Sequence, residues 1–173
     1  MGSEMCIRDR SMIDAYIKQY RRKGIIVDTN LLLLALIGGT PSVVEFKRTR
    51  GYTNEDYRLL LTMIDQFERL VSTPHILAEV SNLTNGLYGS KLHDFYATLK
   101  NSLSTIIEIH SPALDISRDY ELSPYGLTDV GIIALAKDNY LVLTDDLRVA
   151  GFAHQHCVDV VNFNHIREAS WEF

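Results

Sequence analysis

The stretch that decides the fold covers residues 24 to 37 and reads Gly-Ile-Ile-Val-Asp-Thr-Asn-Leu-Leu-Leu-Leu-Ala-Leu-Ile. Its opening apolar run ends on Asp28, which is typical of a strand buried on both faces of a parallel sheet. Residues 30 to 37 then predict a buried helix, whose end is predicted by Gly38-Gly39 and Pro41. A strand that leads directly into a helix is the first unit of an α/β fold.

The same alternation of short β-rich runs and helical patterns continues along the chain, and it predicts a parallel sheet covered by helices. Further strands are predicted over residues 70–73, 105–109, 140–144 and 157–162. Helices are predicted to start at the cap residues Thr53, Thr73, Ser90 and Thr128, to span residues 147–155, and to close the chain with a turn at 165–169. The fold class is therefore α/β, with a central parallel sheet of about five strands.

The chain has 173 residues, a length that suits one compact domain with a single core. Its start shows neither an amphipathic period nor a secretory signal, so we interpret residues 1–12 as a tail, either tag or linker, and residues 13–173 as a single domain. No apolar run approaches the roughly 20 residues of a membrane span. Cys6 and Cys157 form no disulfide framework, which favours a reduced, cytoplasmic setting.

The net charge of −5 speaks against a protein that coats nucleic acid, because neutralising phosphates supplies most non-specific affinity. It does not exclude an enzyme that concentrates acids in a metal site and carries local basic patches. Lys47, Arg48 and Arg50 form such a patch and are our candidates for substrate contacts. Taken alone, a charge run of this kind is more often a solvated surface.

Three aspartates stand where a strand gives way to a helix or where a helix starts, namely Asp28, Asp129 and Asp146. In open parallel sheets ligands bind beyond the carboxyl ends of the strands, and helix N-termini stabilise ionised carboxylates. Glu79 lies deeper in its predicted helix and borders the buried stripe that includes Ile76. We therefore expect these acids to face one edge of the sheet.

Each acid also has a purely structural explanation. Asp145 and Asp146 suit the cap of the helix that follows their strand, and Asp129 suits a first helical turn. Asp28 fits such an explanation less well, because an unpaired buried charge costs several kcal/mol and no lysine or arginine is close in sequence. A divalent ion would neutralise carboxylates that otherwise repel each other. Oxygen-only ligation suits Mg²⁺ or Mn²⁺, and phosphodiester hydrolysis is the natural chemistry of such a site.

Two motifs resemble the opening of the PIN-domain ribonuclease family. Ile26-Val27-Asp28-Thr29-Asn30 is similar to the family's first motif, an apolar strand that ends in Asp-Thr/Ser-Asn. Thr73-Pro74-His75-Ile76-Leu77-Ala78-Glu79-Val80 is similar to the second, a threonine-led strand end followed by a helix that carries the second acid.

Two more motifs follow in the family's order and at similar spacing. Residues 126–136, Gly-Leu-Thr-Asp-Val-Gly-Ile-Ile-Ala-Leu-Ala, resemble the third motif and place Asp129 at the start of a small-residue helix. Leu143-Thr144-Asp145-Asp146-Leu147 resembles the fourth, Thr-x-Asp, and puts Asp146 rather than Asp145 in the acidic position. The resemblance covers about residues 24 to 165, and four motifs in register are far more specific than one.

The resemblance implies a three-layer α/β/α sandwich and a metal-dependent endoribonuclease that hydrolyses RNA. The catalytic acids, which would bind Mg²⁺ or Mn²⁺ directly or through water, would be Asp28, Glu79, Asp129 and Asp146. Supporting roles would fall to Asn30, Thr144 and Asp145. Many relatives are VapC-type toxins and many dimerise, so an antitoxin or other protein partner and a second copy of the chain are further expectations. Extra sequence at residues 47–52 and 111–126 sets this chain apart from the compact toxins.

Other interpretations remain open. A haloacid-dehalogenase-like phosphatase would have an aspartate where this chain has Asn30, and a receiver domain would need a switch lysine that is not convincingly placed. A catalytically silent PIN scaffold that binds RNA or a protein partner is the non-enzymatic alternative. All four acids are present, so the sequence does not indicate a scaffold that has lost its catalytic residues. Metal-dependent turnover would discriminate between enzyme and scaffold.

Overall fold

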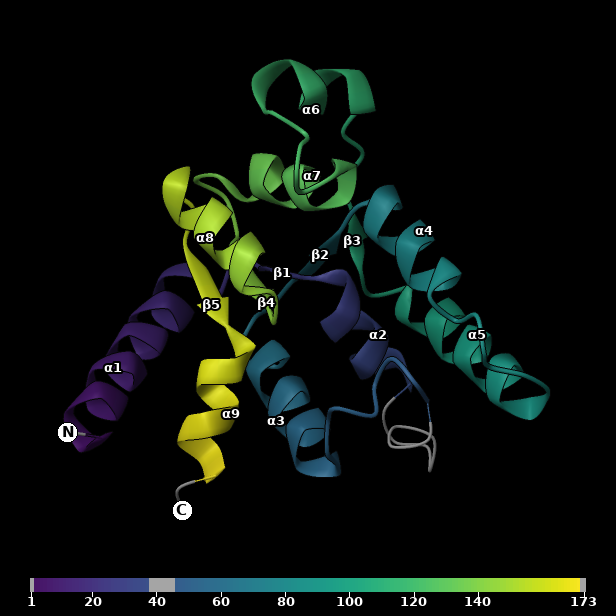
Figure 1. Ribbon diagram of the computed structural model, residues 1–173, viewed down its shortest axis with the longest axis horizontal. Coiled ribbons are helices and arrows are strands. Elements are labelled where there is room, and N and C mark those ends of the chain that lie inside the picture. The colour runs from purple at the N-terminus through teal and green to yellow at the C-terminus, as the bar shows by residue number, and fades with distance from the viewer. Residues whose placement is uncertain (1, 38–45, 172–173) are drawn as a thin grey trace.

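The computed structural model describes residues 2–37 and 46–171 and has a five-stranded sheet at its centre (Figure 1). The strands are β1 Ile25–Val27, β2 Leu70–Ser72, β3 Ile107–Glu108, β4 Leu141–Thr144 and β5 Val160–Asn162. They stand in the order β3-β2-β1-β4-β5, and every neighbouring pair is parallel. With helices on both sides, this is a three-layer α/β/α sandwich, as predicted.

Nine helices lie within the described ranges and surround the sheet (Figure 1). They are α1 Gly2–Tyr20, α2 Thr29–Ile37, α3 Asn54–Ile64, α4 Pro74–Asn82, α5 Ser90–Ser102, α6 Ala113–Asp119, α7 Leu127–Ala136, α8 Leu147–Gln155 and α9 Phe163–Trp171. Helix α2 packs against α3, α4 and α5, whereas α7 packs against α4, α6 and α8. No helix in the described part of the chain is long and apolar enough to cross a membrane.

The first strand and the helix after it form the centre of the core. Strand β1 pairs with β2 on one side and with β4 on the other, and its three residues are at most 1% exposed. Because helices cover both faces of the sheet, apolar residues are needed at every position rather than at alternate ones. Helix α2 likewise buries Leu31, Leu32, Leu33 and Leu34, which explains its nearly continuous apolar sequence.

Two predicted helix starts are confirmed by their capping hydrogen bonds. The backbone N–H of Asp56 donates to Thr53 Oγ1 over 3.1 Å, and the backbone N–H of Thr53 donates to Asp56 Oδ2 over 2.7 Å, which closes the expected capping box. Thr73 Oγ1 accepts from the N–H of Ile76, and Pro74 occupies the first turn of α4. Short polar patterns therefore located these helices correctly.

The other two predicted caps are wrong. Helix α5 contains Ser90 and follows Gly89, and α7 contains Thr128 and follows Gly126, with no side-chain cap at either start. The two glycines have φ angles of 59° and 92°, which glycine adopts without the steric cost that other residues meet. A backbone turn, rather than a side chain, sets the direction of these helices.

The remaining differences concern where elements begin and end. Strand β5 starts at Val160 rather than at the predicted residue 157. Strand β3 is shorter than the predicted residues 105–109, because it is an edge strand that pairs only with β2. Helix α9 extends beyond the closing turn predicted at 165–169. Helix α1 runs without a break through the boundary that we predict between residues 12 and 13. Gly38, Gly39 and Pro41, predicted to end α2, lie outside the described residues.

Candidate functional site

The strand order creates a switch point between β1 and β4. From β1 the chain builds outward through β2 to β3, and it then returns to place β4 and β5 on the other side of β1. Asp28 follows β1 directly, while Asp145 and Asp146 follow β4. Ligands of open parallel sheets bind at the carboxyl ends of the strands where the order reverses. The fold therefore brings acids that are far apart in the sequence to the place where a ligand is expected.

Asp28 is buried at this switch point and is held by two donors. Its side chain, with the residue only 4% exposed, accepts a hydrogen bond from Thr144 Oγ1 on one oxygen and from the Thr29 backbone N–H on the other, each over 2.5 Å. Thr144 Oγ1 in turn accepts from the backbone N–H of Asp146 over 3.0 Å. No ion pair with Asp28 is found among the described residues, so its charge is oriented but not neutralised.

The electrostatics of Asp28 reflect this environment. Burial raises the pKa of Asp28 from 3.8 to about 7, and the hydrogen bond from Thr144 only partly opposes this rise. The negative charges of Asp145 and Asp129 contribute to the same rise. Asp28 thus shares one site with acids from β4 and α7, and a positive ligand would favour its ionised form.

Asp129 connects the remaining acids to this site. It lies in the first turn of α7, and the packing of α4 on α7 brings Glu79 within electrostatic range. The pKa of Asp129 is raised to about 6, chiefly by burial and then by the charges of Glu79 and Asp146, while the charge of Arg148 partly opposes the rise. The four acids predicted from the sequence therefore influence one another through Asp129.

Asp146 differs from the other acids because its carboxylate already has partners. One oxygen accepts from the backbone N–H of Arg148 over 2.7 Å, which caps α8, and the other accepts from Arg148 Nη2 over 3.0 Å. Burial favours a higher pKa for Asp146, but these hydrogen bonds and the charge of Arg148 outweigh it and leave the pKa below its usual value. Asp146 is a helix cap as well as a candidate ligand.

This capping role makes a prediction about stability. We expect Asp146→Ala to lower the free energy of unfolding by about 1 kcal/mol, because the N–H of Arg148 loses its acceptor. Asp146→Asn should retain most of that stability, since asparagine caps helices as well as aspartate does. Urea unfolding of both variants at pH 7 measures the difference. Equal losses in the two variants would contradict the capping role.

The two carboxylate oxygens of Asp145 have different surroundings. Its Oδ2 accepts a hydrogen bond from the hydroxyl of Tyr52, whereas its Oδ1 is buried and has no hydrogen-bond partner among the described residues. A buried polar atom without a partner is rare in folded proteins and marks a place for water, an ion or a ligand.

The other buried polar side-chain atoms without a partner lie at the same edge of the sheet. Within the described residues, the full set is Thr29 Oγ1, Ser72 Oγ, His75 Nδ1, Asp145 Oδ1 and Asn162 Nδ2. Each belongs to the last residue of a strand or to the first residues after it. The carboxyl edge of the sheet therefore concentrates polar atoms whose hydrogen-bonding capacity no other described residue satisfies.

The carboxylates at this edge are of the kind that binds Mg²⁺ or Mn²⁺, but the described residues do not form a ligand cluster. Within residues 2–37 and 46–171, no three His, Cys, Asp or Glu side chains are arranged so that they could hold an ion as they stand. The available donors are carboxylate oxygens, which Mg²⁺ and Mn²⁺ prefer. Like charges raise the pKa values of Asp28 and Asp129, and a cation would relieve that repulsion.

The predicted supporting and substrate-binding residues have different surroundings. Thr144 makes the hydrogen bond to Asp28, whereas Asn30 is exposed and its side chain makes no recorded hydrogen bond to another described residue. The substrate-binding candidates are all exposed and lie in the turn that leads to Tyr52, namely Lys47, Arg48 and Arg50. Since Tyr52 contacts Asp145, this basic turn is joined to the acidic edge by a short segment of chain.

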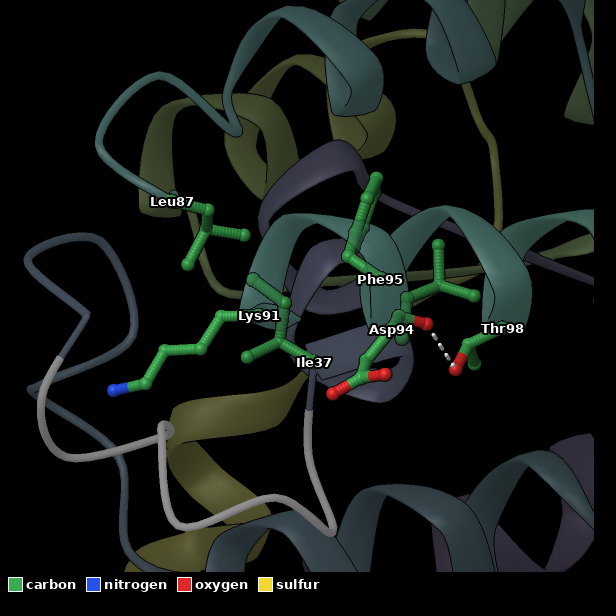
Figure 2. A pocket seen from close by; sticks show the side chains of 7 residues that line it. Ile37, Leu87, Lys91, Asp94, Phe95 and Thr98 are labelled. Atoms are coloured by element: carbon green, nitrogen blue, oxygen red, sulfur yellow. Dashed lines mark hydrogen bonds between the residues drawn. The ribbon is translucent and has the colours of Figure 1, made fainter. Parts of the chain in front are cut away.

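Two cavities are found among the described residues, and neither is lined by the four candidate acids, although the larger one reaches Leu147, the residue after Asp146, and Asn162 at the carboxyl edge of the sheet. The pocket shown in Figure 2 lies between α2 and α5 and has a volume of about 20 Å³, room for one water molecule. In it the hydroxyl of Thr98 already donates to the backbone carbonyl of Asp94. A larger apolar groove of about 430 Å³ is lined by residues of α1, α8, β5 and α9. The candidate site is thus defined by its acids and its place in the fold.

Sequence reasoning did not identify Tyr52 and Arg167 as neighbours of the site. Tyr52 is 93 residues from Asp145, and Arg167 lies in the last helix, where its guanidinium stands 4.9 Å from the centre of the Tyr52 ring. No short-range pattern links residues at such separations. The capping box at Thr53 was the one local sign that the chain is fixed in place near Tyr52.

The sequence matches no protein-family model and no curated protein. The resemblance to PIN domains therefore rests on the four motifs. An α/β/α sandwich is shared by many classes of enzyme, so the fold by itself does not choose among them.

Proposed function

We propose that this protein is a metal-dependent endoribonuclease of the PIN type. The observation that carries the proposal is the set of acids at the switch point. Asp28 is buried there with no ion-pair partner in the described part of the chain, and Asp129 feels the charges of both Glu79 and Asp146. Such like charges must take up protons or bind a cation. Hydrolysis of a phosphodiester with a divalent ion is the activity that best fits this arrangement and the four motifs.

The proposed roles follow from the surroundings of each residue. The residues that would hold Mg²⁺ or Mn²⁺ are Asp28, Glu79, Asp129 and Asp146. When bound, the ion would supply a water of lowered pKa and positive charge for the phosphate oxygens. Thr144 orients Asp28 through its hydroxyl. The exposed basic turn would bind RNA phosphates, which position the strand without reading its sequence, through Lys47, Arg48 and Arg50.

The test is cleavage of labelled single-stranded and hairpin RNAs with Mn²⁺, Mg²⁺ or EDTA. We expect cleavage with either ion and none with EDTA. Asp129→Asn should reduce the rate by about 100-fold or more, because each lost 1.4 kcal/mol of transition-state stabilisation costs about a factor of ten. Asp138→Asn is the matched control, since Asp138 is exposed, follows the opposite end of α7, and has a φ of 64° that asparagine tolerates.

The outcomes separate the proposal from its alternatives. Cleavage that persists in EDTA, or that both variants retain, would point to a contaminating nuclease and count against the proposal. RNA binding without cleavage in any metal would favour a silent scaffold. A toxin role would require in addition that a co-expressed protein partner suppresses the metal-dependent cleavage.

A further inference from the structure

The Tyr52 hydroxyl ties Asp145 to a part of the chain that is distant in sequence. This hydroxyl donates to Asp145 Oδ2, and Tyr52 is only 8% exposed. Burial, followed by the hydrogen bond to Asp145, raises the pKa of Tyr52 above its usual value, so the phenol stays protonated and remains a donor. Oδ1 of the same carboxylate stays unpartnered among the described residues. One oxygen of Asp145 is therefore held by Tyr52, and the other is buried without a hydrogen-bond partner among the described residues.

The Tyr52 ring is itself held by a cation from the last helix. The Arg167 guanidinium lies 4.9 Å from the ring centre and donates to both oxygens of the buried Asp56, over 2.9 and 3.0 Å. It also donates to the backbone carbonyl of Gly51, the residue before Tyr52. An arginine that is bound on this many sides is a rigid support for the ring.

A second connection closes the network around Asp145. Arg167 Nη1 donates to Asn164 Oδ1 over 3.2 Å, and Asn164 Nδ2 donates to the backbone carbonyl of Asp145 over 2.8 Å. Both the side chain and the backbone of Asp145 are thus fixed through Arg167. Asp146, by contrast, has both carboxylate oxygens engaged by Arg148.

We propose that Tyr52 is a positioning residue of the acidic site: its hydroxyl holds the Asp145 carboxylate at the switch point near Asp28, and leaves Asp145 Oδ1 as an additional oxygen ligand for the divalent ion. The inference rests on the proposed function, because it names a further residue that shapes the same site. It assigns a ligand role to Asp145, which the Thr-x-Asp motif does not.

The experiment compares two tyrosine hydroxyls that both donate to carboxylates. Tyr52→Phe removes the donor to Asp145 and keeps the ring against Arg167. Tyr20→Phe is the matched control, because Tyr20 is 4% exposed and its hydroxyl donates to Asp159 Oδ2 over 2.7 Å, away from the acids. Calorimetric titration of the full chain with Mn²⁺, without RNA, measures affinity, and RNA cleavage is then followed against Mn²⁺ concentration.

We expect Tyr52→Phe to weaken Mn²⁺ binding by about ten-fold or more, as is usual when a group that orients a metal ligand is removed. The Mn²⁺ concentration for half-maximal cleavage should rise by the same factor. Tyr20→Phe should change neither quantity, although thermal melts are expected to show a similar loss of stability in both variants. If Tyr52→Phe does not fold, Asp145→Asn tests the same point, since it retains an acceptor for the hydroxyl but loses the charge.

The readouts distinguish this inference from the proposed function. Normal Mn²⁺ affinity in both Tyr52→Phe and Asp145→Asn would overturn the inference even if the protein cleaves RNA. A wild-type protein that binds Mn²⁺ in a Tyr52-dependent way but cleaves no RNA would support the inference and reject the ribonuclease. A wild-type protein that does not bind Mn²⁺ would overturn both.

Discussion

Asp28→Asn is expected to abolish RNA cleavage and, at the same time, to stabilise the metal-free protein above neutral pH. Loss of cleavage should be about a thousand-fold or more, because several kcal/mol of transition-state stabilisation disappear with the buried ligand at about 1.4 kcal/mol per factor of ten. Stabilisation is expected because the variant no longer buries an unneutralised charge next to Asp145 and Asp129. Thr144 can reverse its hydroxyl to accept from the new amide, so the variant keeps a partner there.

The pH dependence of this effect has a definite sign. Asp28 has a pKa of about 7 in the folded protein and an ordinary value of 3.8 when exposed, so the unfolded chain releases its proton first. The contribution of the protonated Asp28 side chain to the free energy of unfolding is fully present below about pH 4 and is lost as pH rises to about 7. At roughly 1.4 kcal/mol for each pKa unit, the penalty above pH 7 is a few kcal/mol. Wild type and variant should therefore differ little at pH 4 and most at pH 8.

Urea unfolding with EDTA, from pH 4 to pH 8, measures this difference. Asp138→Asn serves again as the control, because Asp138 is exposed and follows the opposite end of α7 from Asp129. Adding Mn²⁺ at pH 8 should stabilise the wild type and not Asp28→Asn, since only the state that binds the ion gains from it. A variant that is less stable than wild type at pH 8 without metal would contradict the electrostatic account of Asp28.

Asp56→Asn is expected to have the opposite effect and to destabilise the protein by about 3–5 kcal/mol, the usual cost of breaking a buried ion pair. Asp56 is 1% exposed, and its carboxylate accepts from Arg167 and from the backbone N–H of Thr53. Asparagine would remove the negative charge with which the Arg167 guanidinium pairs and would turn an amide towards one of these donors. The two buried aspartates, Asp28 and Asp56, therefore respond in opposite directions to the same substitution.

An exposed ion pair provides the comparison for Asp56. Arg118 and Asp115 form a pair at 3.5 Å whose side chains are 67% and 60% exposed. Asp115→Asn should cost less than about 1 kcal/mol, because solvent screens such pairs. Chemical unfolding at pH 7 measures both losses. A cost for Asp56→Asn no larger than that for Asp115→Asn would mean that the α3–α9 connection contributes little to stability.

Much of the fold could be predicted from local sequence patterns. The apolar run before Asp28 predicted β1, and the Thr53 and Thr73 signals located α3 and α4, because a cap or a buried strand leaves a mark within a few residues. The caps at Ser90 and Thr128 were wrong, since the backbone at the preceding glycines decides those helix starts. The predicted length of β3 was wrong, because β3 pairs with β2 alone and this pairing depends on the assembled sheet rather than on neighbouring residues.

The candidate site, too, could be predicted only in part from the sequence. The motifs selected Asp28, Glu79, Asp129 and Asp146, and the structure brings these acids within electrostatic reach of one another. The different hydrogen-bond partners of the adjacent Asp145 and Asp146 were not predictable. Asp145 accepts from the distant Tyr52, whereas Asp146 caps α8. An isolated Thr-x-Asp pattern carries no information about partners that are tens of residues away.

By itself, then, the sequence determined the α/β class, the buried first strand and the acids that end or begin its elements, since each depends on the periodicity or chemistry of a few neighbouring residues. The tertiary structure alone decided the order β3-β2-β1-β4-β5, which puts Asp28 next to the end of β4. It also decided that Arg167 and Tyr52 fix Asp145. Strand order and side-chain networks arise from packing between distant segments, and only the folded chain makes those contacts.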